Sequence, residues 1–139
     1  MQKIELFTDS SVNPKAKVGF AAFLVKNDKD TILKSLNKSI KIKKFENTSS
    51  TRIELQSLLW AINEIEKEKN DLSNILIEVY TDCQNIVNLK NRKSKLVEND
   101  YQSGTGKLLK NHDLYKDFFE KESRLNLNII KVKGHKKTI

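Results

Sequence analysis

The feature that most constrains the fold of this chain is one long amphipathic helix set among strand-like segments. Apolar residues recur at helical spacing over residues 51–69 and form a single stripe, made of Leu55, Leu58, Leu59, Ile62 and Ile65. A helix with one apolar stripe buries it against another layer of structure, and the neighbouring strands offer a sheet. The sequence therefore predicts a helix packed on a sheet.

Short apolar segments on both sides of this helix predict the strands, at residues 4–8, 18–26, 32–43, 75–80 and 127–133. Residues 18–26 are apolar up to the last position, which predicts a central, buried strand. Residues 32–43 alternate imperfectly, which predicts a half-exposed strand. Residues 10–17 contain Asn13-Pro14 and are typical of a turn.

Two further helices are predicted at residues 83–90 and 111–122, the second with Asn111 as its N-cap. Residues 90–110 are polar and basic and contain two glycines, so they are expected to form a loop or protrusion. The order is then β-β-β-α-β-α-α-β, which predicts one α/β domain over residues 1–139, with helices packed on a mixed sheet.

Composition limits the setting in which the chain works. One cysteine, Cys83, allows no internal disulfide and suits a reducing compartment. No signal peptide is visible, and the longest apolar run, residues 20–25, is too short to span a bilayer. We therefore expect a cytoplasmic monomer that has no membrane partner.

The formal net charge is +8, with 26 basic against 18 acidic residues, and nearly all the basic residues are lysines. Such a balance suggests a polyanionic partner such as a nucleic acid. The alternative is that the lysines only keep the chain soluble. Contacts between lysines and phosphates would make binding sensitive to salt and tolerant of sequence.

Three carboxylates are candidates for a metal site. Asp9 and Asp82 each end an apolar strand, in the segments FTDS and YTDC, and Glu54 lies near the start of the long helix. Carboxylates at the ends of neighbouring strands can converge on one cation, and Mg²⁺ prefers oxygen ligands. The alternatives are that Asp82 is a helix N-cap and that Glu54 closes a capping box with Thr51.

Five segments resemble motifs of the type 1 ribonuclease H family, in the family's order: IELFTDSS (4–11), STRIEL (50–55), YTDCQ (80–84), KNHDL (110–114) and KVKGH (131–135). The resemblance covers nearly the whole chain. It implies the ribonuclease H-like α/β fold, with a mixed five-stranded sheet flanked by helices. It also implies an endonuclease that hydrolyses the RNA strand of RNA–DNA hybrids.

The resemblance further assigns roles to single residues. Asp9, Glu54 and Asp82 would hold two magnesium ions, with manganese as a possible substitute. His135 would move protons or help release product, since histidine titrates near neutral pH. The residues expected to contact the hybrid, where a 2′-hydroxyl distinguishes RNA from DNA, are Ser10, Asn13, Ser50, Thr51 and Gln84. Ordinary turn and cap chemistry, and a solvated loop for His135, are the alternatives.

The chain also departs from the family pattern. Ser10 stands where glycine is usual, and Ser50 and Thr51 stand where asparagines are common. The family normally has a fourth carboxylate beyond the histidine, at the start of a closing helix, and no Asp or Glu follows His135. Three interpretations stay open: the chain is a fragment, three carboxylates suffice, or the protein is a non-catalytic RNA- or hybrid-binding module on the same fold.

Overall fold

The computed structural model describes residues 2–27 and 32–133. Five strands and three helices follow in the predicted order: β1 (Gln2–Asn13), β2 (Val18–Asn27), β3 (Ile40–Glu46), α1 (Ser50–Glu68), β4 (Ile75–Thr81), α2 (Gln84–Glu98), α3 (His112–Arg124) and β5 (Asn126–Lys131).

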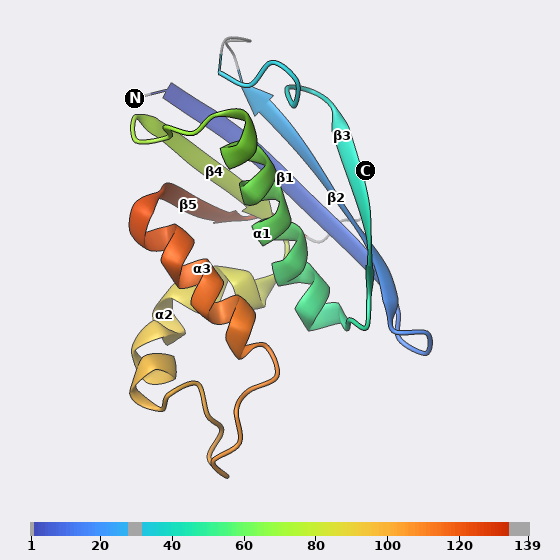
Figure 1. Ribbon diagram of the computed structural model, residues 1–139, viewed down its shortest axis with the longest axis vertical. Helices are drawn as coiled ribbons and strands as arrows, with labels where there is room; N and C mark the ends of the chain where they lie inside the picture. Colours follow the sequence, from blue (N-terminus) through green and yellow to red (C-terminus); the bar gives the residue numbers. More distant parts are fainter. Residues whose placement is uncertain (1, 28–31, 134–139) are drawn as a thin grey trace.

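The strands form one sheet in the order β3-β2-β1-β4-β5, with β1 at its centre (Figure 1). The first three strands are antiparallel neighbours, and β4 and β5 run parallel to β1. The prediction of a mixed five-stranded sheet with helices is confirmed. Because β1 and β4 are parallel, their carboxyl ends lie at the same end of the sheet, where β4 leads into α2.

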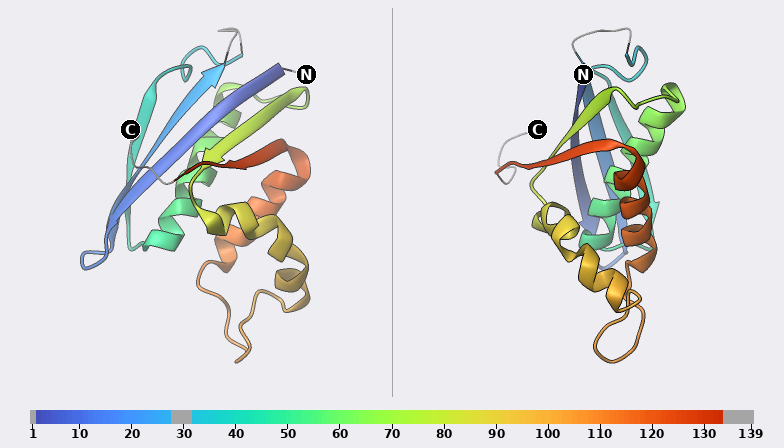
Figure 2. Two further views of the ribbon diagram at one scale, coloured as in Figure 1. Left: turned by 180° about the vertical axis from the view of Figure 1, so that it is seen from behind. Right: turned by 90° about the vertical axis from the view of Figure 1, so that its left-hand side faces the viewer.

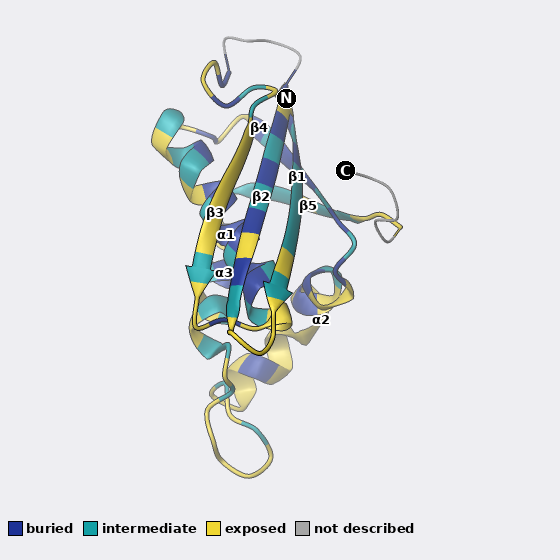
Figure 3. Cartoon of the chain, turned by 90° about the vertical axis from the view of Figure 1, so that its right-hand side faces the viewer, coloured by how far each residue is buried: buried dark blue, intermediate teal, exposed yellow. Residues whose placement is uncertain are grey.

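Helices α1 and α3 cover one face of the sheet, and α2 lies near the carboxyl end of β4 (Figure 2). Between sheet and helices lies the core, whose fully buried members include Ile4, Leu6, Val25, Leu58, Ile62, Ile65, Ile77, Val79 and Phe118. Figure 3 looks onto the other face, where no helix of the described residues lies in front of β1, β2 and β3. Phe20 and Ile42 on that face are 50% and 68% exposed.

The predicted central strand over residues 18–26 is therefore only half right. β2 does lie inside the sheet, between β1 and β3. Its residues alternate between buried and partly exposed, because the helices of the described residues cover one face only. An unbroken apolar run does not distinguish a strand that is buried on both faces from one with an open apolar face.

The predicted strand over residues 32–43 is wrong in its first half. Residues 32–39 form turns with a single bridge to β2, and β3 begins at Ile40. Leu33 and Leu36 are buried in the core. The Glu68 carboxylate at the end of α1 accepts hydrogen bonds from the backbone N–H groups of Ser35 and Leu36 at 3.0 and 3.2 Å. A long-range side-chain contact thus replaces the strand pairing.

The basic stretch that follows residue 90 is also different from the prediction. α2 continues to Glu98, because Ile86, Leu89 and Leu96 form a buried stripe at helical spacing. The lysines and arginine between residues 90 and 95 occupy the exposed side of this helix. Only the segment that follows Asn99 is irregular.

Gly19 in β2 marks a close approach of α1 to the sheet. A Cβ atom added there would lie 2.5 Å from Ile53 Cδ1 of α1 and 2.5 Å from the carbonyl oxygen of Ser11 in β1. Real atoms do not approach so closely, so a larger residue would push the first turns of α1 away from β1 and β2.

In the part of the chain that the structure describes, no helix combines the length and apolar character that crossing a bilayer requires.

Candidate active site

Asp9 reaches the site from the middle of β1. It pairs with Ala22 of β2, and its Oδ1 accepts a hydrogen bond from the backbone N–H of Ser10 at 2.9 Å. Its side chain is half-buried. The strand extends to Asn13, well beyond the predicted residue 8, so Asp9 belongs to a rigid, paired strand rather than to a loop.

Glu54 comes from the second turn of α1. The helix is capped by Ser49, whose Oγ accepts from the backbone N–H of Arg52 at 3.3 Å. A capping box between Thr51 and Glu54 is therefore wrong, because Thr51 already lies inside the helix. Glu54 is half-buried, and the Ser57 hydroxyl donates to its backbone carbonyl at 2.9 Å.

Asp82 stands between the end of β4 and the start of α2. The N-cap of α2 is Cys83, which makes no side-chain capping bond, so Asp82 is not the cap of this helix. The turn is held instead by Thr81, whose buried hydroxyl accepts from the backbone N–H of Cys83 at 3.1 Å.

These three carboxylates line one small pocket of about 80 Å³. The other four lining residues all carry a hydroxyl group: Thr8, Ser10, Ser57 and Thr81. The structure thus brings Asp9, Glu54 and Asp82 to one place from three separate elements. Within residues 2–27 and 32–133, however, no three His, Cys, Asp or Glu side chains already stand where they could hold a metal ion. Metal coordination therefore stays a prediction.

Cys83, which follows Asp82, is packed in the core. Burial raises the pKa of its thiol to about 11, and the nearby Glu54 carboxylate adds to the shift. The thiol is therefore protonated at neutral pH and adds no negative charge to the three carboxylates.

Of the predicted contact residues, Ser10 lines this pocket and the other four do not. The Asn13 side chain caps the β1–β2 turn, accepting from the backbone N–H groups of Lys15 and Ala16 at 3.0 and 3.2 Å. Ser50 and Thr51 are exposed in the first turn of α1, and Gln84 is the exposed first residue of α2. His135 lies outside the described residues.

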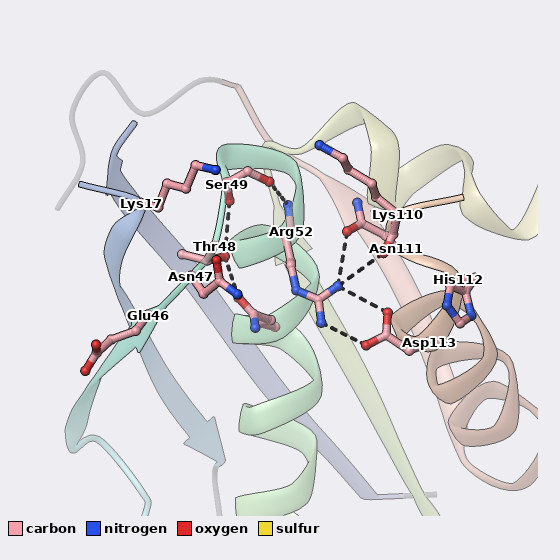
Figure 4. A pocket seen from close by; sticks show the side chains of 11 residues that line it. Lys17, Glu46, Asn47, Thr48, Ser49, Arg52, Lys110, Asn111, His112 and Asp113 are labelled. Carbon is pink, nitrogen blue, oxygen red and sulfur yellow. Dashed lines mark hydrogen bonds and ion pairs between the residues drawn. The ribbon is translucent and has the colours of Figure 1, made fainter. Parts of the chain in front are cut away.

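A second, larger pocket of about 640 Å³ was not predicted. It lies between the β1–β2 turn, the start of α1 and the start of α3 (Figure 4). Lys17, Arg52 and Lys110 line it, together with two acidic residues, Glu46 and Asp113. We call it the basic pocket, and the first one the acidic pocket.

Arg52 joins the two helices at the basic pocket. Its guanidinium donates to both carboxylate oxygens of Asp113 at 2.8 and 3.1 Å, and to Asn111 Oδ1 at 3.3 Å. This contact with Arg52 lowers the pKa of Asp113 below its ordinary value. Asn111 is the N-cap of α3, as predicted, but its side chain makes no capping bond. The segments that carry Arg52 and Asp113, STRIEL and KNHDL, could be recognised in the sequence. The contact between these two residues, which lie 61 positions apart, could not.

Comparison with known proteins identifies the family of this chain. The family model for RNase H matches residues 1–139. The chain belongs to the RNase H family. The resemblance seen in the motifs is thereby confirmed.

Relatives in the RNase H family extend over nearly the whole chain. A ribonuclease H of Caldicellulosiruptor saccharolyticus is 27% identical over 139 residues, which cover 97% of this chain and 86% of the relative. A ribonuclease H of Haemophilus influenzae is 32% identical over 142 residues, covering 97% and 80%.

Solved structures show the same fold. LC9-RNase H1, a type 1 RNase H with the type 2 active-site motif, superposes with a TM-score of 0.76 at 18% identity. The match covers 97% of this chain and 64% of that structure, so this chain spans less than two thirds of it. LC11-RNase H1 gives a TM-score of 0.69 at 16% identity, and the match covers 98% of this chain and 88% of that one.

Proposed function

We propose that this chain is a magnesium-dependent ribonuclease H that hydrolyses the RNA strand of RNA–DNA hybrids. The observation that carries the proposal is the acidic pocket, in which Asp9, Glu54 and Asp82 meet, in a chain of the RNase H family. Its relatives are named ribonuclease H, which supports an activity of the same kind here. We also propose a cytoplasmic location and a monomeric state.

The acidic pocket fits magnesium by the kind of donor that it offers. Its lining side chains contribute only oxygen ligands, three of them carboxylates, and Mg²⁺ prefers such ligands. Magnesium also keeps several of its waters, so a carboxylate that does not touch the ion directly can still hold it through a water molecule. Bound metal would activate the attacking water and stabilise the leaving oxygen of the RNA strand.

We propose that Asp9 and Asp82 hold the first ion, together with Glu54. Three carboxylates carry less charge than two magnesium ions, so a second ion would depend on substrate phosphate and water. The surrounding residues keep this arrangement fixed: the Ser10 N–H holds Asp9, and Thr81 fixes the turn at Asp82. We propose that His135 moves protons or assists product release.

The basic pocket suits the phosphate backbone of the substrate. Lys17 and Lys110 supply positive charge, and the starts of α1 and α3 both border the pocket. Helix N-termini favour anions, because their first backbone N–H groups have no partner within the helix. Such contacts fix the position of a duplex without reading its sequence.

The test is a cleavage assay on three duplexes of one sequence: RNA–DNA hybrid, DNA duplex and RNA duplex. We expect cleavage of the hybrid's RNA strand with Mg²⁺ or Mn²⁺, none in a chelator, and a loss of orders of magnitude in Asp9→Asn. Asp71→Asn is the matched control, because Asp71 is an exposed carboxylate in the α1–β4 connection. Equal cutting of DNA duplex, or full activity in chelator, contradicts the proposal. Tight hybrid binding without cleavage would identify the non-catalytic module instead.

A further inference from the structure

Gln84 has a side chain whose orientation is fixed by two neighbours. Its Oε1 accepts a hydrogen bond from Lys131 Nζ at the end of β5, and its Nε2 donates to Asn88 Oδ1 at 2.9 Å. Asn88 lies one turn further along α2. The amide thus has a partner at each end, although Gln84 and Lys131 are both exposed.

The position of Lys131 places this contact beside the acidic pocket. Lys131 is the register partner of Thr81, whose side chain lines that pocket. Gln84 begins α2 two positions after Asp82. A duplex bound at the carboxylates would therefore pass close to the Gln84 amide.

A lysine ammonium fixes the direction of a glutamine amide because it offers donors and no acceptor. It can contact only Oε1, so Nε2 must point away from it. Nε2 carries two protons, and one of them is donated in a hydrogen bond to Asn88 Oδ1. The second proton is available to an acceptor outside the protein.

We propose that Lys131 is a positioning residue, which orients the Gln84 amide so that it donates from Nε2 to an acceptor in the minor groove of the bound hybrid. Suitable acceptors there are the base atoms purine N3 and pyrimidine O2 and the ribose 2′-oxygen. This inference rests on the function proposed above. A contact between Gln84 and the hybrid is already what the family resemblance implies, and the new element is Lys131, which makes the amide a donor toward the hybrid.

The competing role for Lys131 is a direct contact with a phosphate. The two roles differ in what they depend on. A phosphate contact acts without Gln84 and strengthens the binding of every duplex alike. A positioning role disappears when Gln84 is removed, because Lys131 then has no amide to orient.

The first experiment observes the contact in the free protein. The side-chain amide resonances of Gln84 are recorded by ¹⁵N NMR in the wild type, Lys131→Met and Lys131→Arg. We expect the Lys131→Met substitution to shift and broaden these resonances, while Lys131→Arg, which keeps the donors, restores them. Unchanged resonances in Lys131→Met would overturn the inference, whatever the activity.

The second experiment is a double-mutant cycle of Lys131→Met and Gln84→Ala, read as KM and kcat on hybrid and as affinity for hybrid and for DNA duplex. We expect Lys131→Met to raise KM about three- to tenfold, the loss expected for one hydrogen bond, with kcat nearly unchanged. In the Gln84→Ala background it should add little. Lys41→Met, which removes a charge from the opposite edge strand β3, is the matched control.

The outcomes separate the possibilities. Additive losses in the double-mutant cycle overturn the positioning role in favour of a phosphate contact. Gln84→Glu provides a further check, since it keeps an acceptor for Lys131 and loses the free donor; affinity for hybrid at the wild-type level would overturn the donor role. A wild-type protein that neither cuts nor prefers hybrid overturns the proposed function itself, and the NMR result then shows separately whether the Lys131–Gln84 contact exists.

Discussion

The acidic and basic pockets share one helix and use it in opposite ways. Glu54 and Arg52 lie two positions apart on α1 and therefore about 200° apart around its axis. One side chain lines the pocket that β1 and β4 complete, and the other reaches α3. A single helix start thus supplies a carboxylate to one site and a guanidinium to the next.

The two pockets also differ in the contacts that their charged side chains already make. The basic pocket contains a bidentate ion pair between Arg52 and Asp113, which fixes α1 against α3. The acidic pocket has its carboxylates in place, but among the described residues no three are already disposed around a metal position. The basic pocket therefore has a fixed contact between its two helix starts, whereas metal binding at the acidic pocket stays a proposal.

The largest effect is expected from breaking the acidic pocket. Asp82→Asn should lower kcat/KM on hybrid by more than about a hundredfold, since outer-shell partners of metals already cost 10–100-fold. The fold should survive because Asp82 caps no helix. Cleavage kinetics and thermal unfolding of the same preparation check both statements. Activity within tenfold of the wild type would remove Asp82 from the site.

Magnesium should stabilise the acidic pocket without any substrate. At a concentration 100 times its dissociation constant, an ion that binds only the folded state adds about 2.7 kcal/mol to the free energy of unfolding. Unfolding followed with and without Mg²⁺ measures the gain. We expect it to be lost in Asp9→Asn and kept in Arg52→Met. A gain that is unaffected by Asp9→Asn would place the metal elsewhere.

Breaking the basic pocket should weaken binding and spare the chemical step. Arg52→Met removes a cation and its hydrogen bonds to Asp113, which join α1 to α3, so the affinity for hybrid should fall by about tenfold. Arg52→Lys keeps the charge and loses the bidentate geometry, so it separates the two contributions. A fall in kcat with unchanged KM would contradict this division of roles.

The smallest expected effect is a loss of folding stability at low pH. It arises at the other end of the contact between α1 and α3, away from Arg52 and Asp113. Glu66 of α1 accepts from Arg124 at 2.6 Å and from the nearly buried Lys121 at 3.0 Å. Hydrogen bonding to Arg124 lowers the pKa of Glu66 below its ordinary 4.5. The resulting stability is present above pH 4.5 and is lost as the pH falls through the lowered value.

Glu66→Gln should therefore flatten the dependence of unfolding free energy on pH in this range, relative to the wild type. Glu98→Gln is the control, because Glu98 is an exposed carboxylate at the end of α2. Equal flattening by both variants would mean that general charge, and not the contacts of Glu66, sets the acid response.

The order and type of all eight elements could be predicted from local patterns, because each element carries its own apolar period. The predicted ends of the strands were wrong where a long-range contact determines where the strand begins or ends. Residues 32–39 are held by the Glu68 carboxylate at the end of α1, which no local period reveals. β1 extends to Asn13 because β2 pairs with it, although its last residues are polar.

The candidate site likewise contains residues that the sequence could predict and residues that it could not. The three carboxylates could be selected because they follow apolar strand segments or lie near a helix start, and the motifs supported the choice, although Asp9 lies within β1 and not at its end. The basic pocket could not, since it depends on the pairing of two helix starts in space. The side chain of Asn111 shows why: an expected cap residue contacts Arg52 instead.

Gly19 has a consequence for reading mutational data on this protein. It touches neither pocket, yet any side chain there would collide with Ile53 and with the backbone of Ser11 and displace the helix start that carries both Glu54 and Arg52. In a saturation screen scored by activity, Gly19 should be as intolerant as the carboxylates themselves. Screening the same library for abundance would separate the two classes, because substitutions at Asp9 should leave the protein level intact and those at Gly19 should not.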